Sequence, residues 1–178
     1  VVGRGPSIFK LKHLETLAKS NFNGYILASD GILIDMLKAG IVPWAVLVVD
    51  GSDVVKKWFD HPLVREYGSQ IKAIVCSTVH PTVLTLIDQA KMPIYWFLPA
   101  HDDGTSEESF TRAISFMTVG EVRKEPLLSL ECLGNVAGAT LVFAWVILKC
   151  EEIGLIGLDY GYPADMPREE TYYWTGTV

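Results

Sequence analysis

Short runs that are hydrophobic at every position constrain the fold of this chain more than any other sequence feature. The run 44–49 is apolar throughout and ends at Asp50. Largely apolar runs occupy 24–29, which ends in Ser29, 71–76, which contains Lys72, and 94–98 and 153–157. Strands without polar alternation are covered on both faces, as parallel strands are. Because segments with helical spacing separate these runs, the sequence predicts an α/β fold: an open, mostly parallel Rossmann-like sheet with helices on both faces and right-handed crossovers.

The segments between the runs supply the expected helices, which cover 8–17, 32–40, 54–67, 81–90 and 136–150. We expect Pro62 to divide the third of these into two pieces, because proline breaks the helical hydrogen-bond ladder. The segment 106–126 is predicted as a helix with a connection, and 127–133 fits either a strand or a helix.

Size and composition favour one globular domain over 1–178. The chain has 178 residues, 49 % of them hydrophobic, which is enough to bury one sizeable core. It begins at Val1 inside a predicted strand, so we expect the natural protein to extend further upstream. The longest apolar run, 136–148, is shorter than a membrane span and is predicted as a buried helix.

Charge and cysteine usage limit the partners. The chain carries 21 acidic and 15 basic residues without a basic run, so neither nucleic acid nor an anionic membrane is an expected partner. A polyanionic ligand would need local devices such as a helix N-terminus or a metal ion. Cys76, Cys132 and Cys150 are odd in number and widely spaced, which predicts reduced thiols in a cytoplasmic protein.

The first seven residues, Val1–Ser7, combine a strand end, a glycine turn and a helix start. Gly3 and Gly5 allow a tight turn and a close approach to a ligand, and Pro6 suits a first helical position. Free N–H groups behind the turn favour an anion, with phosphate as the expected occupant. Arg4 is placed either to bind that phosphate bidentately or to remain solvated.

Acidic residues follow most of the predicted strands. In an open parallel sheet the carboxyl ends of the strands form one binding edge, so these side chains should converge there. They are Asp30, Asp50, Asp53, Asp102, Asp103 and Asp159. Clustered carboxylates suit Mg²⁺, which takes one or two of them together with substrate phosphates. Asp30 and Asp53 are equally suited to cap the helices that follow them.

Two further polar positions lie at strand or helix ends. His101, beside Asp102 and Asp103, fits a general base, a metal ligand, a phosphate donor or a loop histidine without chemistry. Asn135, after Gly134, fits phosphate or base recognition at a helix start, or simple capping. The aromatic residues of the tail suit ring stacking or packing, including the interface of a homo-oligomer. These are Tyr160, Tyr162, Tyr172, Tyr173 and Trp174.

These motifs together resemble the archaeal 6-hydroxymethyl-7,8-dihydropterin diphosphokinase-like family, which is similar to the motility-associated flagellin glycosyltransferases. The resemblance rests on Gly3-Arg4-Gly5-Pro6-Ser7, Ser29-Asp30-Gly31, Asp50-Gly51, His101, Gly134-Asn135-Val136 and 156–162. Two motifs differ from the family: its D-x-D-G strand end has Val48 at the first acid, and its H-A-H-G-D-N loop is Pro99-Ala100-His101-Asp102-Asp103-Gly104.

The resemblance implies Mg²⁺-dependent transfer of a pyrophosphoryl group from ATP to the hydroxymethyl group of a small pterin acceptor. It implies catalytic roles for Asp50, His101 and Asp103, with Asp50 and Asp103 on the metal. The nucleotide-binding set is Gly3, Arg4, Gly5, Pro6, Ser7, Asp30, Gly134, Asn135 and Asp159. Two alternatives stay open: a glycosyltransferase that uses a nucleotide-activated sugar, and a non-catalytic nucleotide-binding module.

Overall fold

A single parallel sheet organises the molecule. The computed structural model describes residues 1–167 and 171. Its five strands are β1 (Leu27–Ser29), β2 (Ala45–Val48), β3 (Lys72–Cys76), β4 (Ile94–Pro99) and β5 (Ser129–Leu130), in the spatial order β1-β2-β3-β4-β5. All four strand pairings are parallel. The predicted fold class is therefore confirmed.

Two single residues continue the sheet beyond β1. Val2 pairs in parallel with Ala28 of β1 on one side and with Ile156 on the other. The first and last apolar runs of the chain thus lie side by side at one end of the sheet. The predicted final strand over 153–157 is reduced to this one bridge.

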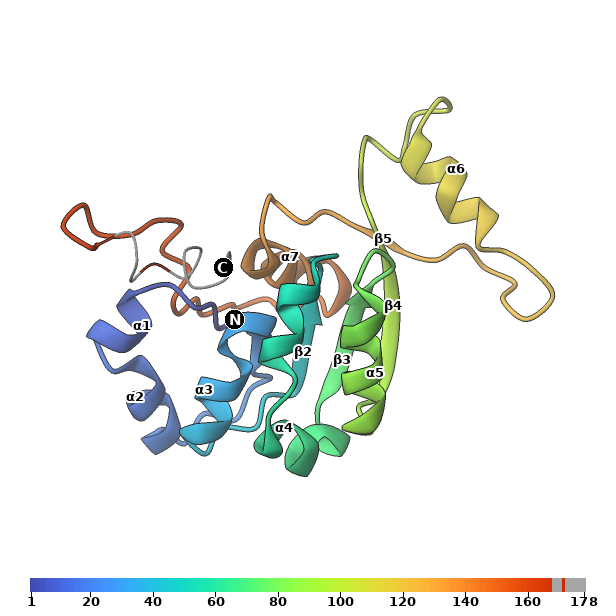
Figure 1. Ribbon diagram of the computed structural model, residues 1–178. Helices are drawn as coiled ribbons and strands as arrows, with labels where there is room; N and C mark the ends of the chain where they lie inside the picture. Colours follow the sequence, from blue (N-terminus) through green and yellow to red (C-terminus); the bar gives the residue numbers. More distant parts are fainter. Residues whose placement is uncertain (168–170, 172–178) are drawn as a thin grey trace.

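The helical elements run in chain order between the strands. They are α1 (Ser7–Lys10), α2 (His13–Lys19), η1 (Asp30–Ile32), α3 (Leu33–Lys38), η2 (Asp53–Trp58), α4 (Pro62–Tyr67), η3 (Gly68–Gln70), α5 (Pro81–Gln89), α6 (Phe110–Met117), α7 (Val136–Val142) and the π-helical η4 (Phe143–Ile147). Helices α1 to α5 and α7 lie around the sheet, whereas α6 projects away from it beyond β4 and β5 (Figure 1).

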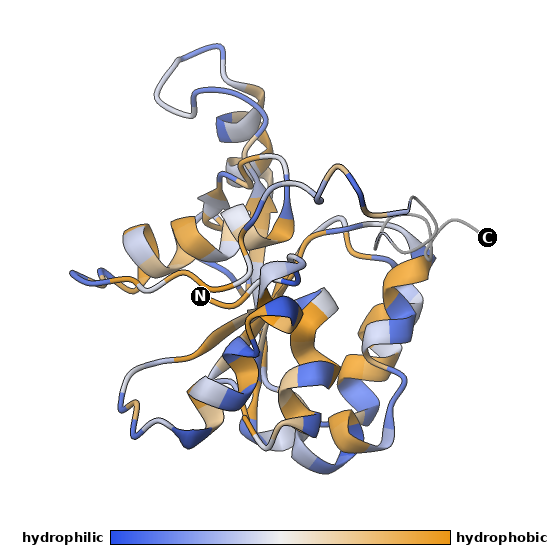
Figure 2. Ribbon diagram, turned by 90° about the vertical axis from the view of Figure 1, so that its left-hand side faces the viewer, coloured by the Kyte–Doolittle hydropathy of each residue, from blue (hydrophilic) through white to orange (hydrophobic). Residues whose placement is uncertain are grey.

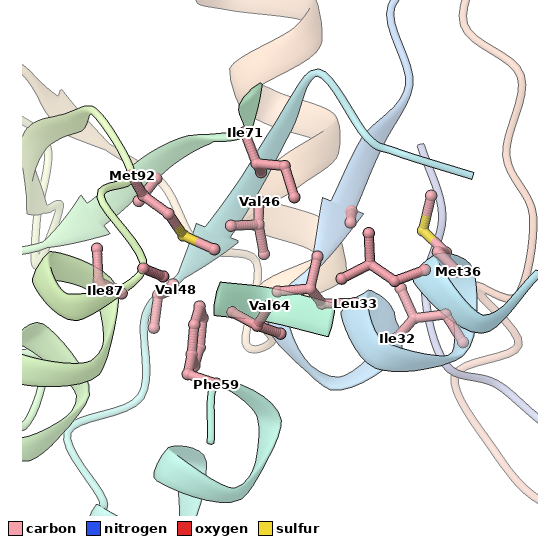
Figure 3. Close-up of a cluster of buried hydrophobic side chains, with 14 of the residues drawn as sticks. Ile32, Leu33, Met36, Val46, Val48, Phe59, Val64, Ile71, Ile87 and Met92 are labelled. Carbon is pink, nitrogen blue, oxygen red and sulfur yellow. The ribbon is translucent and has the colours of Figure 1, made fainter. Parts of the chain in front are cut away.

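Alternate strand residues supply two separate cores. Val46 and Val48 of β2 face the larger core, which holds side chains from α1 to α5. Ala45 and Leu47 of the same strand face the smaller core, which holds Ala139 of α7 and the start of η4. Figure 3 shows the larger core, where Phe59 and Val64 pack beneath β2. Helices therefore cover both faces of the sheet. Hydrophobic residues lie mainly in the interior, and hydrophilic residues gather in the outer turns (Figure 2).

A histidine followed by a proline begins two of the helices. His61 Nδ1 accepts the N–H of Leu63 at 3.2 Å before α4, and His80 Nδ1 accepts the N–H of Thr82 at 3.3 Å before α5. The proline after each histidine occupies the first helical position, where no N–H is needed. Pro62 thus divides the predicted 54–67 helix as expected.

The predicted helix over 8–17 is wrong as one piece. It is two helices, α1 and α2, with Lys12 in a left-handed conformation at φ 54° between them. Ile8 and Leu14 are both buried, yet their six-residue spacing places them on different sides of one straight helix. The break turns both side chains toward the sheet and leaves Leu11 60 % exposed.

Candidate functional site at the carboxyl edge of the sheet

The glycine turn after Val2 is packed against a second turn after Ile156. The Gly3 N–H donates to the Ile156 carbonyl and the Gly5 N–H to the Gly157 carbonyl, each at 2.8 Å. A Cβ added to Gly3 would lie 2.6 Å from the Gly157 oxygen, so only glycine allows this backbone contact. These two amides are thus already bonded to carbonyls of the last turn.

Asp159 holds the start of α1, where we expected an anion. Its carboxylate accepts the Ser7 N–H at 2.6 Å and the Ser7 hydroxyl at 2.5 Å. Pro6 precedes Ser7 and offers no N–H of its own. The predicted phosphate position behind the turn is thus filled by a carboxylate of the protein, and a phosphate would have to displace it.

Arg4 lies beside the turn in a cluster that the sequence did not indicate. Its Nε donates to Asp35 Oδ2 of α3 at 3.2 Å. Its guanidinium lies over the ring of Trp58 at 4.9 Å, and Lys57 Nζ lies over the same ring at 4.6 Å. Arg4 therefore places a positive charge between the glycine turn and η2.

Asp30 is a buried carboxyl at the end of β1. It is 4 % exposed, and its Oδ1 accepts the N–H of Gly31 at 2.7 Å. Its Oδ2 is buried and has no hydrogen-bond partner among the described residues. Burial, and to a smaller extent the charge of Asp50, raise the pKa of Asp30 to about 7. The amide that Asp30 Oδ1 bonds belongs to η1, the turn that leads directly into α3, so within the described residues Asp30 bonds the start of this helical segment and not an N–H of α3.

Asp50 follows β2, the neighbouring strand. It is exposed, and its Oδ1 accepts the Ser52 N–H at 2.8 Å. The loop is braced against the end of β3, because the Thr78 hydroxyl donates to the Val49 carbonyl at 3.2 Å. Gly51 lies so close to Thr78 that a Cβ there would be 2.8 Å from the Thr78 oxygen. The loop that carries Asp50 is thus held against the end of β3, and the Asp50 charge is close enough to influence Asp30.

Asp30 and Asp50 are the described residues that could hold a magnesium ion. Mg²⁺ usually binds one or two carboxylates and completes its shell with water and substrate phosphates. Asp30 and Asp50 supply two carboxylates at the ends of neighbouring strands, and Asp30 Oδ2 is buried without a hydrogen-bond partner among the described residues. Within 1–167 and 171, no three His, Cys, Asp or Glu side chains gather into a metal site. Asp103, the other predicted ligand, follows β4, two strands along from β2.

The loop 101–105 is organised around α6. Asp102 accepts hydrogen bonds from the Ser109 hydroxyl at 2.7 Å and from the N–H groups of Phe110 at 2.7 Å and Thr111 at 3.0 Å. These bonds hold the pKa of Asp102 well below its usual range. Asp103 accepts the N–H and the hydroxyl of Thr105, which lower the pKa of Asp103.

His101 begins this loop, and its ring packs near Phe110 at 5.7 Å between centroids. It is exposed. Its backbone N–H donates to Thr111 Oγ1 at 2.8 Å. The imidazole is therefore available at the base of the α6 projection.

Gly134 and Asn135 directly precede α7, which lies on the face of the sheet opposite to α1 to α5. Asn135 Oδ1 accepts the Gly138 N–H at 2.8 Å, which is a capping bond. The carboxyl-edge start of α7 approaches the last turn, since a Cβ on Gly138 would lie 3.4 Å from the Tyr160 hydroxyl. Tyr172, Tyr173 and Trp174 lie outside the described residues.

The strand order shows which predicted residues meet. The sheet runs from Ile156 through Val2 and β1 to β5, with neighbouring strands about 4.8 Å apart. Asp159, the glycine turn, Asp30 and Asp50 thus share one half of the edge. The loop after β4 is four strands from Val2, roughly 19 Å along the sheet.

This fold and edge define a Rossmann-like α/β protein whose candidate site combines a glycine turn with paired carboxylates. The chain belongs to the family described as 6-hydroxymethylpterin diphosphokinase MptE-like, whose model matches residues 1–165. No curated protein and no solved structure matches the chain. In the described part of the chain, every helix is too short or too polar to cross a membrane.

Proposed function

We propose that this protein catalyses Mg²⁺-dependent transfer of a pyrophosphoryl group from ATP to the hydroxymethyl group of a pterin-like acceptor. The family supports a relationship to pterin diphosphokinases. The observation that carries the proposal is the buried Asp30 oxygen without a donor, beside the Asp50 carboxylate at the same edge. A divalent cation at this pair would relieve both the missing partner and the repulsion between the carboxylates.

In this proposal the role of each site residue depends on its position along the carboxyl edge of the sheet. Asp30 and Asp50 would hold the Mg²⁺, which supplies positive charge to the phosphates. Arg4 brings a second positive charge to the same half of the edge, next to the turn. Charge stabilisation and alignment are the main contributions that a protein makes to such a transfer.

The acceptor would lie over the end of β3, between Asp50 after β2 and His101 after β4. These two strands are two spacings apart, roughly 10 Å. His101 would accept the proton of the acceptor hydroxyl as its oxygen attacks the β-phosphorus of ATP. The bond from that phosphorus to the α-phosphate oxygen breaks, and AMP leaves.

The test is the formation of AMP from ATP in the presence of Mg²⁺ and 6-hydroxymethyl-7,8-dihydropterin. We expect pterin-dependent AMP from the natural sequence and a loss of about a hundredfold or more for Asp50→Asn. Asp88→Asn, an exposed carboxylate on α5, is the matched control and should keep full activity. Nucleotide binding without pterin-dependent AMP would overturn the proposal in favour of the glycosyltransferase or the binding module.

A further inference from the structure

Phe110, the first residue of α6, holds its ring beside the imidazole of His101. The two ring centroids lie 5.7 Å apart, with an angle of 55° between the ring planes. Although α6 projects away from the sheet (Figure 1), its first turn is tied by hydrogen bonds to the loop that follows β4. Phe110 is nevertheless 57 % exposed. An exposed aromatic ring therefore lies next to the residue that we propose as proton acceptor.

Hydrogen bonds hold Phe110 and His101 in this relative position. The hydroxyl oxygen of the buried Thr111 accepts the N–H of His101 at 2.8 Å and that of Asp102 at 3.1 Å. In return, the Asp102 carboxylate accepts the N–H of Phe110 at 2.7 Å and that of Thr111 at 3.0 Å. The loop and the first turn of α6 thus form one connected unit, which places the two rings together.

The exposure of the Phe110 ring favours a ligand with a flat apolar face. A fully covered aromatic side chain buries about 150–250 Å², so roughly 100 Å² of Phe110 remains open to water. A second aromatic ring, stacked or tilted against Phe110, would remove much of that area from water. Stacking of this kind accepts any planar heteroaromatic ring, since each has a π-face.

The acceptor of the proposed reaction has its reacting group close to such a ring. In 6-hydroxymethyl-7,8-dihydropterin the hydroxyl oxygen is only two bonds from the pterin ring. A pterin stacked on Phe110 would therefore bring its hydroxyl to the neighbouring His101 imidazole, the place where the proposed function needs it. Orientation of this kind is a large part of what a protein contributes to such a transfer.

The direction of the transfer decides which ring of the reaction lies at Phe110. In phosphoryl transfer the attacking and leaving oxygens lie on opposite sides of the phosphorus, roughly in line. The attacking oxygen lies toward His101, so the departing AMP lies toward Asp50 and Asp30 on the other half of the edge. The adenine is thereby directed away from Phe110, and the acceptor ring is the one within its reach.

We propose that Phe110 stacks on the planar ring of the acceptor and so selects a heteroaromatic alcohol over acceptors without an aromatic ring. This inference rests on the proposed function, because that function places the acceptor hydroxyl beside His101. Phe110 binds and positions the ring, whereas His101 takes the proton. Loss of the Phe110 ring should therefore weaken the binding of the acceptor and leave that of ATP unchanged.

The test is calorimetric titration of 6-hydroxymethyl-7,8-dihydropterin, and of pterin without the hydroxymethyl group, with Mg²⁺ and a non-hydrolysable ATP analogue present. Phe110→Ala should weaken both affinities about tenfold, as expected for the stacking of a base on an aromatic side chain. In the AMP assay the same variant should raise KM for the acceptor and not for ATP. Phe110→Trp should retain binding.

Phe116→Ala is the matched control. Phe116 is 56 % exposed on the same helix, but it lies roughly 9 Å further along the helix axis than Phe110. Its removal should leave both pterin affinities unchanged. Because each ring is more than half exposed, neither variant should change the thermal unfolding of the chain.

The outcomes distinguish the stacking role from the proposed reaction. Equal pterin affinities in Phe110→Ala and Phe116→Ala would overturn the stacking role, and so would a loss of ATP affinity alone in Phe110→Ala. Pterin-dependent AMP with an unchanged acceptor KM in Phe110→Ala would keep the reaction and overturn the stacking role. Pterin binding that depends on Phe110, without AMP formation, would support the stacking role and overturn the reaction. An absence of pterin binding to the natural sequence would overturn both.

Discussion

Asp159 holds Ser7 by two hydrogen bonds, one to the backbone N–H at 2.6 Å and one to the hydroxyl at 2.5 Å, across 152 positions of sequence. This contact joins the first turn of the chain to the last described strand end. It supports the backbone pairing of Gly3 and Gly5 with the same segment. The two ends of the chain thus build one half of the candidate site.

We predict that Asp159→Asn destabilises the fold through this contact. Charge-assisted hydrogen bonds contribute about 1–3 kcal/mol, and exposure of this pair favours the lower end of that range. Urea denaturation should therefore show a loss of about 1–2 kcal/mol. Asp165→Asn removes an exposed carboxylate nearby in sequence and should change nothing. Equal stabilities of the two variants would show that the contact contributes little.

A second prediction concerns the close approach at Gly157. This residue has φ +67°, and an added Cβ would lie 2.6 Å from the Gly3 oxygen. Gly157→Ala should cost about 2–4 kcal/mol of unfolding free energy, because strain and a backbone clash act together. Gly154→Ala is the matched control, since nothing lies within 4 Å of its added Cβ. A Gly157→Ala variant as stable as the control would refute the packing of the two turns.

The buried Asp30 predicts how stability changes with pH. Its pKa is raised from 3.8 to about 7, so the folded state holds a proton that the unfolded state releases. The free energy of unfolding is therefore highest below about pH 4. It falls as the pH rises from there through 7, by on the order of 4 kcal/mol in total. Asp30→Asn should remove this decline from chemical denaturation curves measured between pH 4 and 8.

The neighbouring carboxylate provides the control for that pH effect. Asp50 raises the pKa of Asp30 through its charge, although burial contributes more. Asp50→Asn should thus keep the decline and move its midpoint to lower pH. A flat profile in the natural sequence would contradict the burial of an ionisable Asp30.

A further prediction concerns the start of α6. Asp102 accepts bonds from the Ser109 hydroxyl and the Phe110 and Thr111 amides. Asp102→Ala should speed hydrogen exchange at those two amides, and the same loss should occur in the natural sequence as acid protonates Asp102. Its pKa is lowered, so its contribution to stability is present above the ordinary carboxyl range and lost below it. Asp103→Ala should leave α6 protected, because in the described part of the chain the Asp103 carboxylate bonds Thr105 and not α6.

The apolar runs were sufficient to predict the architecture, because a strand buried on both faces has apolar residues at consecutive positions of the sequence. Val46 and Val48 face one core and Ala45 and Leu47 the other, as an all-apolar strand requires. The break at Lys12 was not predictable in this way. Leu11 fits the helical pattern of its neighbours, and only the position of the sheet decides that it remains exposed.

The candidate site was predicted in part for the same reason. Once the strands are predicted, the residues at their carboxyl ends are known, so the edge positions of Asp30, Asp50 and Asp159 could be inferred. The cluster of Arg4, Lys57 and Trp58 could not, because it depends on contacts between distant segments. Likewise, no sequence signal indicates that the glycine amides are bonded to the last strand.

The most direct test of the account is calorimetric titration of ATP into the protein with Mg²⁺ and again with EDTA. The proposed role of Asp30 and Asp50 predicts that Mg²⁺ tightens ATP binding at least about tenfold in the natural sequence and in Asp88→Asn. That gain should vanish in Asp30→Asn and in Asp50→Asn. If both variants keep the full Mg²⁺ dependence, the metal is bound elsewhere and the central claim is wrong.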